Sequence, residues 1–225
     1  MNHARNLQFL AAWLRDPLQT GALLPSGTAL AEAMAAQVDP GRGRVVELGA
    51  GTGAVTHALL ARGLTPEQLV VVEKDPALLG EIERRFPGIV ALIGDAGRLR
   101  QLLGRAGARH PATLVSSLPL LGMARRQRLR VLIEMFASLG AGGVLVQFTY
   151  SPLPPIGDVL AKALGVSGTC VARVFLNLPP AAVWVYRAGR PRRGRRALNT
   201  TAPGEDASCA VTDLVERERV LARAP

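Results

Sequence analysis

The sequence has few of the residues that build metal centres, disulfide frameworks or membrane spans. Its 225 residues include 2 cysteines and 3 histidines, and the cysteines, Cys170 and Cys209, do not have metal-ligand spacing. No apolar run approaches the roughly 18 residues that cross a bilayer, and the N-terminus lacks the pattern of a signal peptide. We therefore expect no metal site and no membrane span, and a chain that works in the cytoplasm or at a membrane surface.

Acidic residues are scarce relative to basic ones. The chain has 27 Lys and Arg against 17 Asp and Glu, which gives a net charge of +10. A basic surface favours nucleic acid or an anionic membrane as a partner, and charge alone does not choose between them. The hydrophobic share of 48% suits one α/β domain with an ample core.

Short apolar runs that alternate with helical patterns predict a doubly wound, Rossmann-like sheet. Five strands and a closing hairpin make this a seven-stranded, mostly parallel α/β sheet with a terminal antiparallel strand. This domain should span 41–188, after N-terminal helices and a loop in 1–40 and before a basic, disordered tail at 189–225. The expected strands are 45–48, 69–73, 89–93, 112–117, 144–150, 171–177 and 182–186, with helices at about 27–38, 54–62, 75–86, 98–105, 123–139 and 156–164.

Residues 2–15 have the pattern of an amphipathic helix. Its apolar stripe includes Leu10, with Phe9 and Trp13 beside it. Two interpretations stay open: the helix packs over the edge of the sheet, or it lies in a membrane interface with its aromatic rings as anchors. The uncharged loop 19–28 that follows is either a lid over a ligand or a plain connection.

Glycines and acids fall where the predicted strands end. Gly49, Gly51 and Gly53 follow the first strand and precede a helix, which makes a turn that a ligand can approach closely. Glu73 ends the second strand, at the distance where a carboxylate accepts two hydrogen bonds from a ribose diol. Asp95 ends the third strand and suits an adenine amino group. Together these positions predict a nucleoside-cofactor site.

The order of the residues separates two cofactor classes. A dinucleotide site has the pattern G-x-G-x-x-G, whereas here Glu47 precedes three glycines spaced by two. A fixed carboxylate at this place would repel a pyrophosphate and suit the ammonium group of a cationic ligand. The pattern therefore favours S-adenosylmethionine.

The segment Val45-Val-Glu-Leu-Gly-Ala-Gly-Thr-Gly53 closely resembles motif I of the class I S-adenosylmethionine-dependent methyltransferases. Gly94-Asp95-Ala96 and Ser116-Ser-Leu-Pro119 resemble the rRNA adenine dimethylases. The N-terminal helix, Thr20-Gly-Ala-Leu-Leu-Pro-Ser26, Ser117-Leu-Pro119 and Asn177-Leu-Pro-Pro-Ala181 resemble the soluble, peripheral bacterial phospholipid N-methyltransferases. That resemblance covers about residues 5–187. It implies successive N-methylation of phosphatidylethanolamine, through its mono- and dimethyl forms, towards phosphatidylcholine at the inner face of the cell membrane.

The resemblance and the chemistry of the residues near the strand ends together give the candidate site residues. The cofactor set is Glu47, Gly49, Ala50, Gly51, Thr52, Gly53, Glu73, Lys74, Asp95, Ala96, Ser116 and Gly21. The catalytic candidates are Tyr150 and Ser117, and the substrate set is Tyr150, Arg173, Leu118 and Pro119. The membrane-binding set is Phe9, Leu10, Trp13, Arg125 and Arg126. The two arginines begin a long helix that also carries Arg128 and Arg130, and this basic face lies either against an anionic leaflet or in solvent.

The substrate end departs from the adenine dimethylases. Their turn carries an amide or acid and an aromatic ring that stacks on the target base, whereas Ser117-Leu118-Pro119 has neither. Nucleic acid is therefore not the expected partner. Tyr150 is the candidate that orients the substrate nitrogen, or it is a rim tyrosine with no such role. The alternatives are an RNA adenine or small-amine methyltransferase, and a binding module that keeps the fold without catalysis.

Overall fold

The computed structural model describes residues 25–175 and 180–188. The predicted N-terminal amphipathic helix with Phe9, Leu10 and Trp13, the first part of the loop with Gly21, the turn at 176–179 and the basic tail lie outside the described residues.

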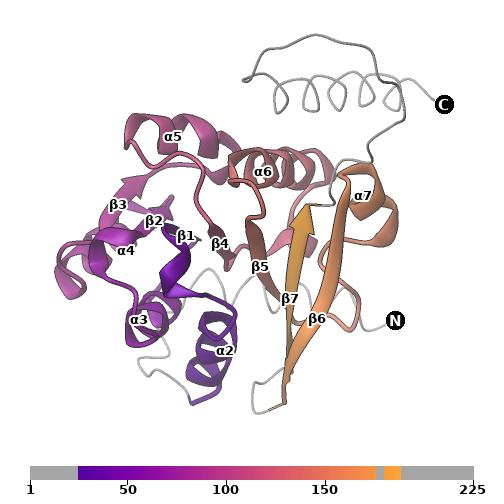
Figure 1. The fold of residues 1–225 in the computed structure, drawn as a ribbon. Helices are drawn as coiled ribbons and strands as arrows, with labels where there is room; N and C mark the ends of the chain where they lie inside the picture. The colour runs from indigo at the N-terminus through magenta and orange to yellow at the C-terminus, as the bar shows by residue number, and fades with distance from the viewer. Residues whose placement is uncertain (1–24, 176–179, 189–225) are drawn as a thin grey trace, which may run out of the picture.

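In the described part of the chain, seven strands form one sheet, with the order β3-β2-β1-β4-β5-β7-β6. Only β7 runs antiparallel to its two neighbours, β5 and β6. It is the last strand of the described chain, and Figure 1 shows it between β5 and the edge strand β6. The predicted sheet is confirmed. The strands are β1 (Val45–Leu48), β2 (Leu69–Glu73), β3 (Val90–Ile93), β4 (Thr113–Ser116), β5 (Val144–Thr149), β6 (Val166–Val174) and β7 (Ala181–Ala188).

Helices cover both faces of the sheet (Figure 1). The central strands are buried on both sides, so their sequences are nearly continuous apolar runs. One core layer holds buried side chains of α2, α3 and α4, and the other holds those of α5 and α6, with α7 packed at its side. The helices are α2 (Pro25–Ala35), α3 (Ala54–Ala61), α4 (Pro76–Arg85), α5 (Leu99–Arg105), α6 (Arg125–Ser138) and α7 (Asp158–Ala163), with short 3₁₀ turns η1 (Pro40–Arg42), η2 (Pro66–Gln68), η3 (Ala96–Arg98) and η4 (Leu120–Gly122).

Strand β6 begins five residues before the predicted start at Val171. The prediction missed its first half because Ser167, Gly168 and Thr169 resemble a loop and are exposed on an edge strand. Gly168 has a packing role, since a Cβ there would collide with the ring of buried Tyr186. The phenol of Tyr186 accepts a hydrogen bond from the Ile156 amide.

Candidate cofactor and substrate site

The glycine turn joins β1 to α3 at the carboxyl edge of the sheet. Gly49, Gly51 and Gly53 all have positive φ, at 74°, 53° and 81°. A Cβ at Gly53 would lie 2.6 Å from Ile82 Cδ1, so this glycine serves the packing of α4. A Cβ at Gly51 would meet no described heavy atom within 4 Å. The turn is therefore packed tightly at Gly53 and open at Gly51, as a ligand cradle requires.

Glu73, at the end of β2, is tied to this turn. Its Oε2 accepts from the Gly51 amide at 3.1 Å, and its Oε1 accepts from the amides of Lys74 and Asp75 at 2.7 and 3.1 Å. A carboxylate has about four acceptor positions, so three are filled and one remains on Oε2. In this arrangement Glu73 can accept one further hydrogen bond, where the sequence analysis expected two from a ribose diol.

Glu47 lies beneath the glycine turn and is fully buried. Its Oε2 accepts from the Thr56 hydroxyl at 2.8 Å, while Oε1 has no hydrogen-bond partner among the described residues. Burial raises the pKa of Glu47 to about 7, the Thr56 hydrogen bond opposes the rise, and the charge of Glu73 adds to it. An unpaired, buried carboxylate oxygen is costly, and a cationic ligand group would offset that cost.

The end of β3 lies beside the end of β2 at the same edge of the sheet. Gly94 N donates to Glu73 O at 2.9 Å, which links this end of β3 to β2. Asp95 then caps the η3 turn, since its Oδ1 accepts from the Gly97 amide at 2.7 Å. The exposed Asp95 carboxylate keeps its other oxygen for a ligand. Ala96 is half-buried in the same turn.

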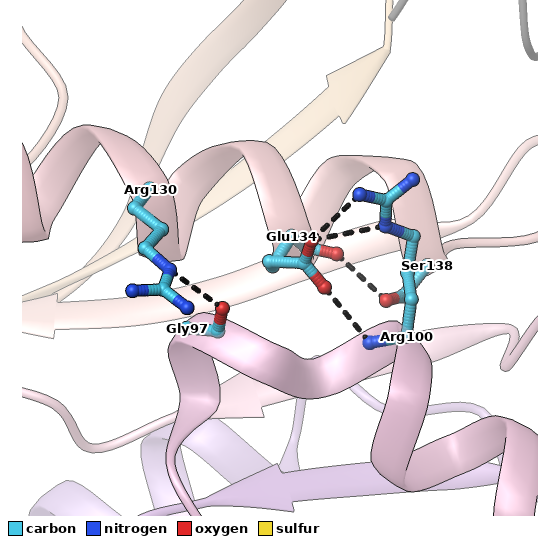
Figure 2. A network of polar contacts seen from close by, with 5 residues as sticks. All are labelled: Gly97, Arg100, Arg130, Glu134 and Ser138. Carbon is cyan, nitrogen blue, oxygen red and sulfur yellow. Dashed lines mark hydrogen bonds and ion pairs between the residues drawn. The ribbon is translucent and has the colours of Figure 1, made fainter.

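Helix α6 lies beside the η3 turn, and its Arg130 side chain reaches that turn (Figure 2). Arg130 Nε donates to Gly97 O at 2.9 Å. The guanidinium of Arg130 therefore secures the η3 turn, a contact that its place in a basic helix did not indicate. Arg125 and Arg126, at the start of α6, are exposed.

The turn after β4 is held by three backbone groups. Ser117 N donates to Leu48 O at 2.9 Å, and Leu118 N donates to the hydroxyl of buried Ser116 at 3.3 Å. Leu118 O accepts from Gln147 Nε2 at 3.0 Å. The Leu118 side chain also packs over Gly49, where a Cβ would lie 2.9 Å from Leu118 Cδ2. The turn thus borders the glycine cradle directly, and Pro119 beside it is exposed.

Gln147 was missed by the sequence analysis. It is fully buried in β5, and its Oε1 is unpaired within the described part of the chain. The available signal was a lone amide inside the apolar run Val144-Leu-Val-Gln-Phe148, since such a residue is rarely buried without a partner. In the structure, Gln147 Nε2 donates to the carbonyls of Leu118 and Phe148, at 3.0 and 2.9 Å.

The two remaining substrate candidates, Tyr150 and Arg173, are placed by different strands but lie at the same edge of the sheet. Tyr150 directly follows β5 and is half-buried, with its ring edge-on to Phe148 at a centroid distance of 5.2 Å. Arg173 is exposed on β6, where it pairs with Ala182 of β7, and Ala182 pairs in turn with Thr149 of β5. It therefore lies at the same edge of the sheet as Tyr150, two strands away. Lys74 and Thr52 also lie at this edge, exposed and half-buried respectively.

The described residues also bear on metal binding and on membrane spans. No group of three or more His, Cys, Asp or Glu side chains in residues 25–175 and 180–188 is arranged to hold a metal ion. Within the same residues, no helix combines the length and the apolar character that a bilayer span requires.

Solved structures share this architecture. A TehB-like S-adenosylmethionine-dependent methyltransferase from Corynebacterium glutamicum superposes with a TM-score of 0.55 at 18% identity, over 82% of this chain and 98% of that one. The 1,6-didemethyltoxoflavin-N1-methyltransferase of Burkholderia thailandensis, solved with S-adenosylhomocysteine, gives 0.57 at 14% identity, over 83% and 88%. The chain has the class I methyltransferase fold.

Curated sequences give two kinds of similarity, and no family model matches the chain. The ribosomal RNA small subunit methyltransferase A of Burkholderia ambifaria is 47% identical over 62 residues, which is 26% of this chain and 23% of that protein. The chain thus matches about a quarter of the length of such relatives. The ornithine lipid N-methyltransferase of Singulisphaera acidiphila is 28% identical over 188 residues, which cover 80% of this chain and 94% of that protein.

The residues at this edge fit S-adenosylmethionine. The open side of Gly51 leaves room for a ligand against the backbone, and Glu73 and Asp95 keep acceptor positions for a nucleoside. The unpaired oxygen of Glu47 provides a negative group for the cationic end. This donor and acceptor set suits a positively charged nucleoside better than a pyrophosphate.

Proposed function

We propose that this chain transfers methyl groups from S-adenosylmethionine to the amine of a phospholipid headgroup, phosphatidylethanolamine and its mono- and dimethyl forms, at a membrane surface. The observation that most supports S-adenosylmethionine as the cofactor is the state of Glu47, a fully buried carboxylate with one unpaired oxygen beneath an open glycine turn. The likeness to an ornithine lipid N-methyltransferase over four fifths of the chain supports an aminolipid substrate.

The cofactor is held by the three strand ends described above. Gly51 lets the backbone approach it, Oε2 of Glu73 accepts from the ribose, and Asp95 accepts from the adenine amino group. Glu47 balances the positive charge of the methionine end, directly or through water. When bound, S-adenosylmethionine supplies an electrophilic methyl group to a nucleophile placed in line with it.

The turn after β4 receives the substrate amine. Its residues and Gln147 are uncharged, so an ammonium group that enters is desolvated and loses its proton to water or a nearby acceptor more readily. Tyr150, fixed edge-on against Phe148, orients the nitrogen and contacts the increasingly methylated cation through its ring. Arg173, at the same edge, pairs with the lipid phosphate.

Methylation of an rRNA adenine is the second candidate, and the local 47% identity to an rRNA methyltransferase favours it. The substrate turn argues against it, because Ser117-Leu118-Pro119 lacks an aromatic ring to stack on a base. The two candidates share the cofactor and differ in the methyl acceptor, so one assay separates them.

The test is transfer of a radiolabelled methyl group to three acceptors offered in parallel: phosphatidylethanolamine vesicles, ornithine lipid vesicles and bulk RNA. We expect thin-layer chromatography to show label in phosphatidylethanolamine derivatives, and no label with Gly51→Ala. Label in ornithine lipid alone would overturn the phosphatidylethanolamine assignment, and label in RNA alone would overturn the lipid assignment. Failure to bind S-adenosylhomocysteine would overturn methyl transfer itself.

A further inference from the structure

Two side chains of α6 hold the segment that runs from β3 into α5. Arg130 Nε donates to the Gly97 carbonyl at 2.9 Å. One turn later, Glu134 accepts three hydrogen bonds from Arg100, from its backbone N at 2.9 Å, its Nε at 3.0 Å and its Nη2 at 2.7 Å. Figure 2 shows both contacts side by side on α6. The Glu134 side chain is 13% exposed and the Arg100 side chain 49%, so solvent screens the ion pair from the Arg100 side only.

The start of α5 explains why Glu134 is needed. The first amides of a helix have no partner inside it and are usually capped by the residue before. Arg98 holds that place in α5 and makes no capping hydrogen bond through its side chain within the described chain. Glu134 supplies the cap from a different helix, through its Oε2 and the Arg100 amide.

Gly97 is fixed from two sides. Its amide donates to Asp95 Oδ1 at 2.7 Å, and its carbonyl accepts from Arg130. A Cβ at Gly97 would lie 3.0 Å from Asp95 Oδ1 and 3.3 Å from Arg130 Nε, so glycine allows this close contact. The position of the Asp95 carboxylate therefore depends on α6 as well as on its own strand.

We propose that Arg130 and Glu134 are positioning residues that set the purine specificity of the cofactor site. They hold the η3 turn where the free oxygen of Asp95 meets the amino edge of adenine, and neither side chain touches the cofactor. This inference rests on the proposed cofactor. It gives α6 two roles, because the helix also begins three residues after η4, at the substrate end of the site.

The test measures binding by calorimetry of S-adenosylhomocysteine and of S-inosylhomocysteine, whose base carries a carbonyl oxygen in place of the amino group. We expect the wild-type chain to prefer the adenine compound. In Arg130→Gln and in Glu134→Gln that preference should fall by about five- to tenfold, through weaker binding of the adenine compound alone. Arg105→Gln, which removes an exposed charge at the end of α5, should keep the wild-type preference.

Each outcome decides the proposal. An unchanged preference in both variants, even with a lower melting temperature, would show that the network only stabilises the fold and would overturn the inference. If Arg130→Gln fails to fold, the isosteric Glu134→Gln decides. A wild-type chain that binds the two compounds equally would overturn the specificity claim while leaving methyl transfer intact, and one that binds neither would overturn the proposed function as well.

Discussion

At the scale of single residues, Glu47 is the most informative side chain. It was predicted from its place before the glycines, and the structure adds that it is completely buried with one oxygen unpaired. Because its pKa is raised to about 7, the Glu47 carboxyl loses its proton near pH 7 in the folded chain and near pH 4.5 in the unfolded chain. The residue thus destabilises the empty fold at neutral pH and favours binding of a cation.

The pH dependence of stability follows from this pKa. Between about pH 4.5 and pH 7 the folded state binds more protons at Glu47, so the free energy of unfolding should decrease as the pH rises and level off above 7. The change is about 3 kcal/mol. Urea denaturation of the wild type and of Glu47→Gln, at about pH 5 and about pH 8, should show this slope in the wild type alone.

The comparison of the two proteins is its own control, because all other titrating groups cancel in their difference. A difference in stability between wild type and Glu47→Gln that stays constant across this pH range would contradict the raised pKa.

At the scale of elements, the site is assembled where strand ends meet, and the sequence predicts strand ends well. Glu73, Asp95 and Ser116 each close an apolar run, so their shared edge follows from parallel strand geometry. The contacts of Gln147 and Arg130 could not be predicted, because their partners lie 29 and 33 residues away and depend on how α6 and β5 pack. The first half of β6 was missed because an exposed edge strand has no apolar pattern.

Gln147 provides a prediction at this scale. Gln147→Leu removes the donor to the Leu118 carbonyl and leaves the turn after β4 free to shift. We expect kcat to fall about tenfold or more, with little change in the affinity for S-adenosylhomocysteine, because the glycine cradle is untouched. Stability should change by only about 1 kcal/mol, since the substitution also removes the unpaired Oε1.

Steady-state kinetics and calorimetry measure these two quantities separately. A parallel loss of kcat and of cofactor affinity would indicate instead that Gln147 supports the whole edge of the sheet.

At the scale of the whole molecule, the net charge of +10 favours attraction to the anionic membrane surface at which the proposed reaction takes place. Flotation with anionic vesicles should show binding that weakens as salt is raised, because screening shortens the reach of surface charges. Arg125→Gln and Arg126→Gln, at the exposed start of α6, should each weaken binding by on the order of fivefold, since a cation near an anionic surface contributes about 1 kcal/mol.

Arg84→Gln is the matched control, because Arg84 is also exposed but belongs to α4, on the opposite face of the sheet. Equal losses in all three variants would mean that the attraction depends on total charge and that the start of α6 has no special place at the membrane.

The order of the last strands has a consequence for how the protein is made. Strand β7 is the last strand of the described chain, yet it lies between β5 and β6, both of which leave the ribosome before it. Until Ala181–Ala188 emerges, the apolar β5 has an unpaired edge, and a direct pairing of β5 with β6 would have to open again to admit β7. We therefore expect synthesis of this segment to be the step at which the nascent chain changes from an aggregation-prone intermediate to the complete seven-stranded sheet.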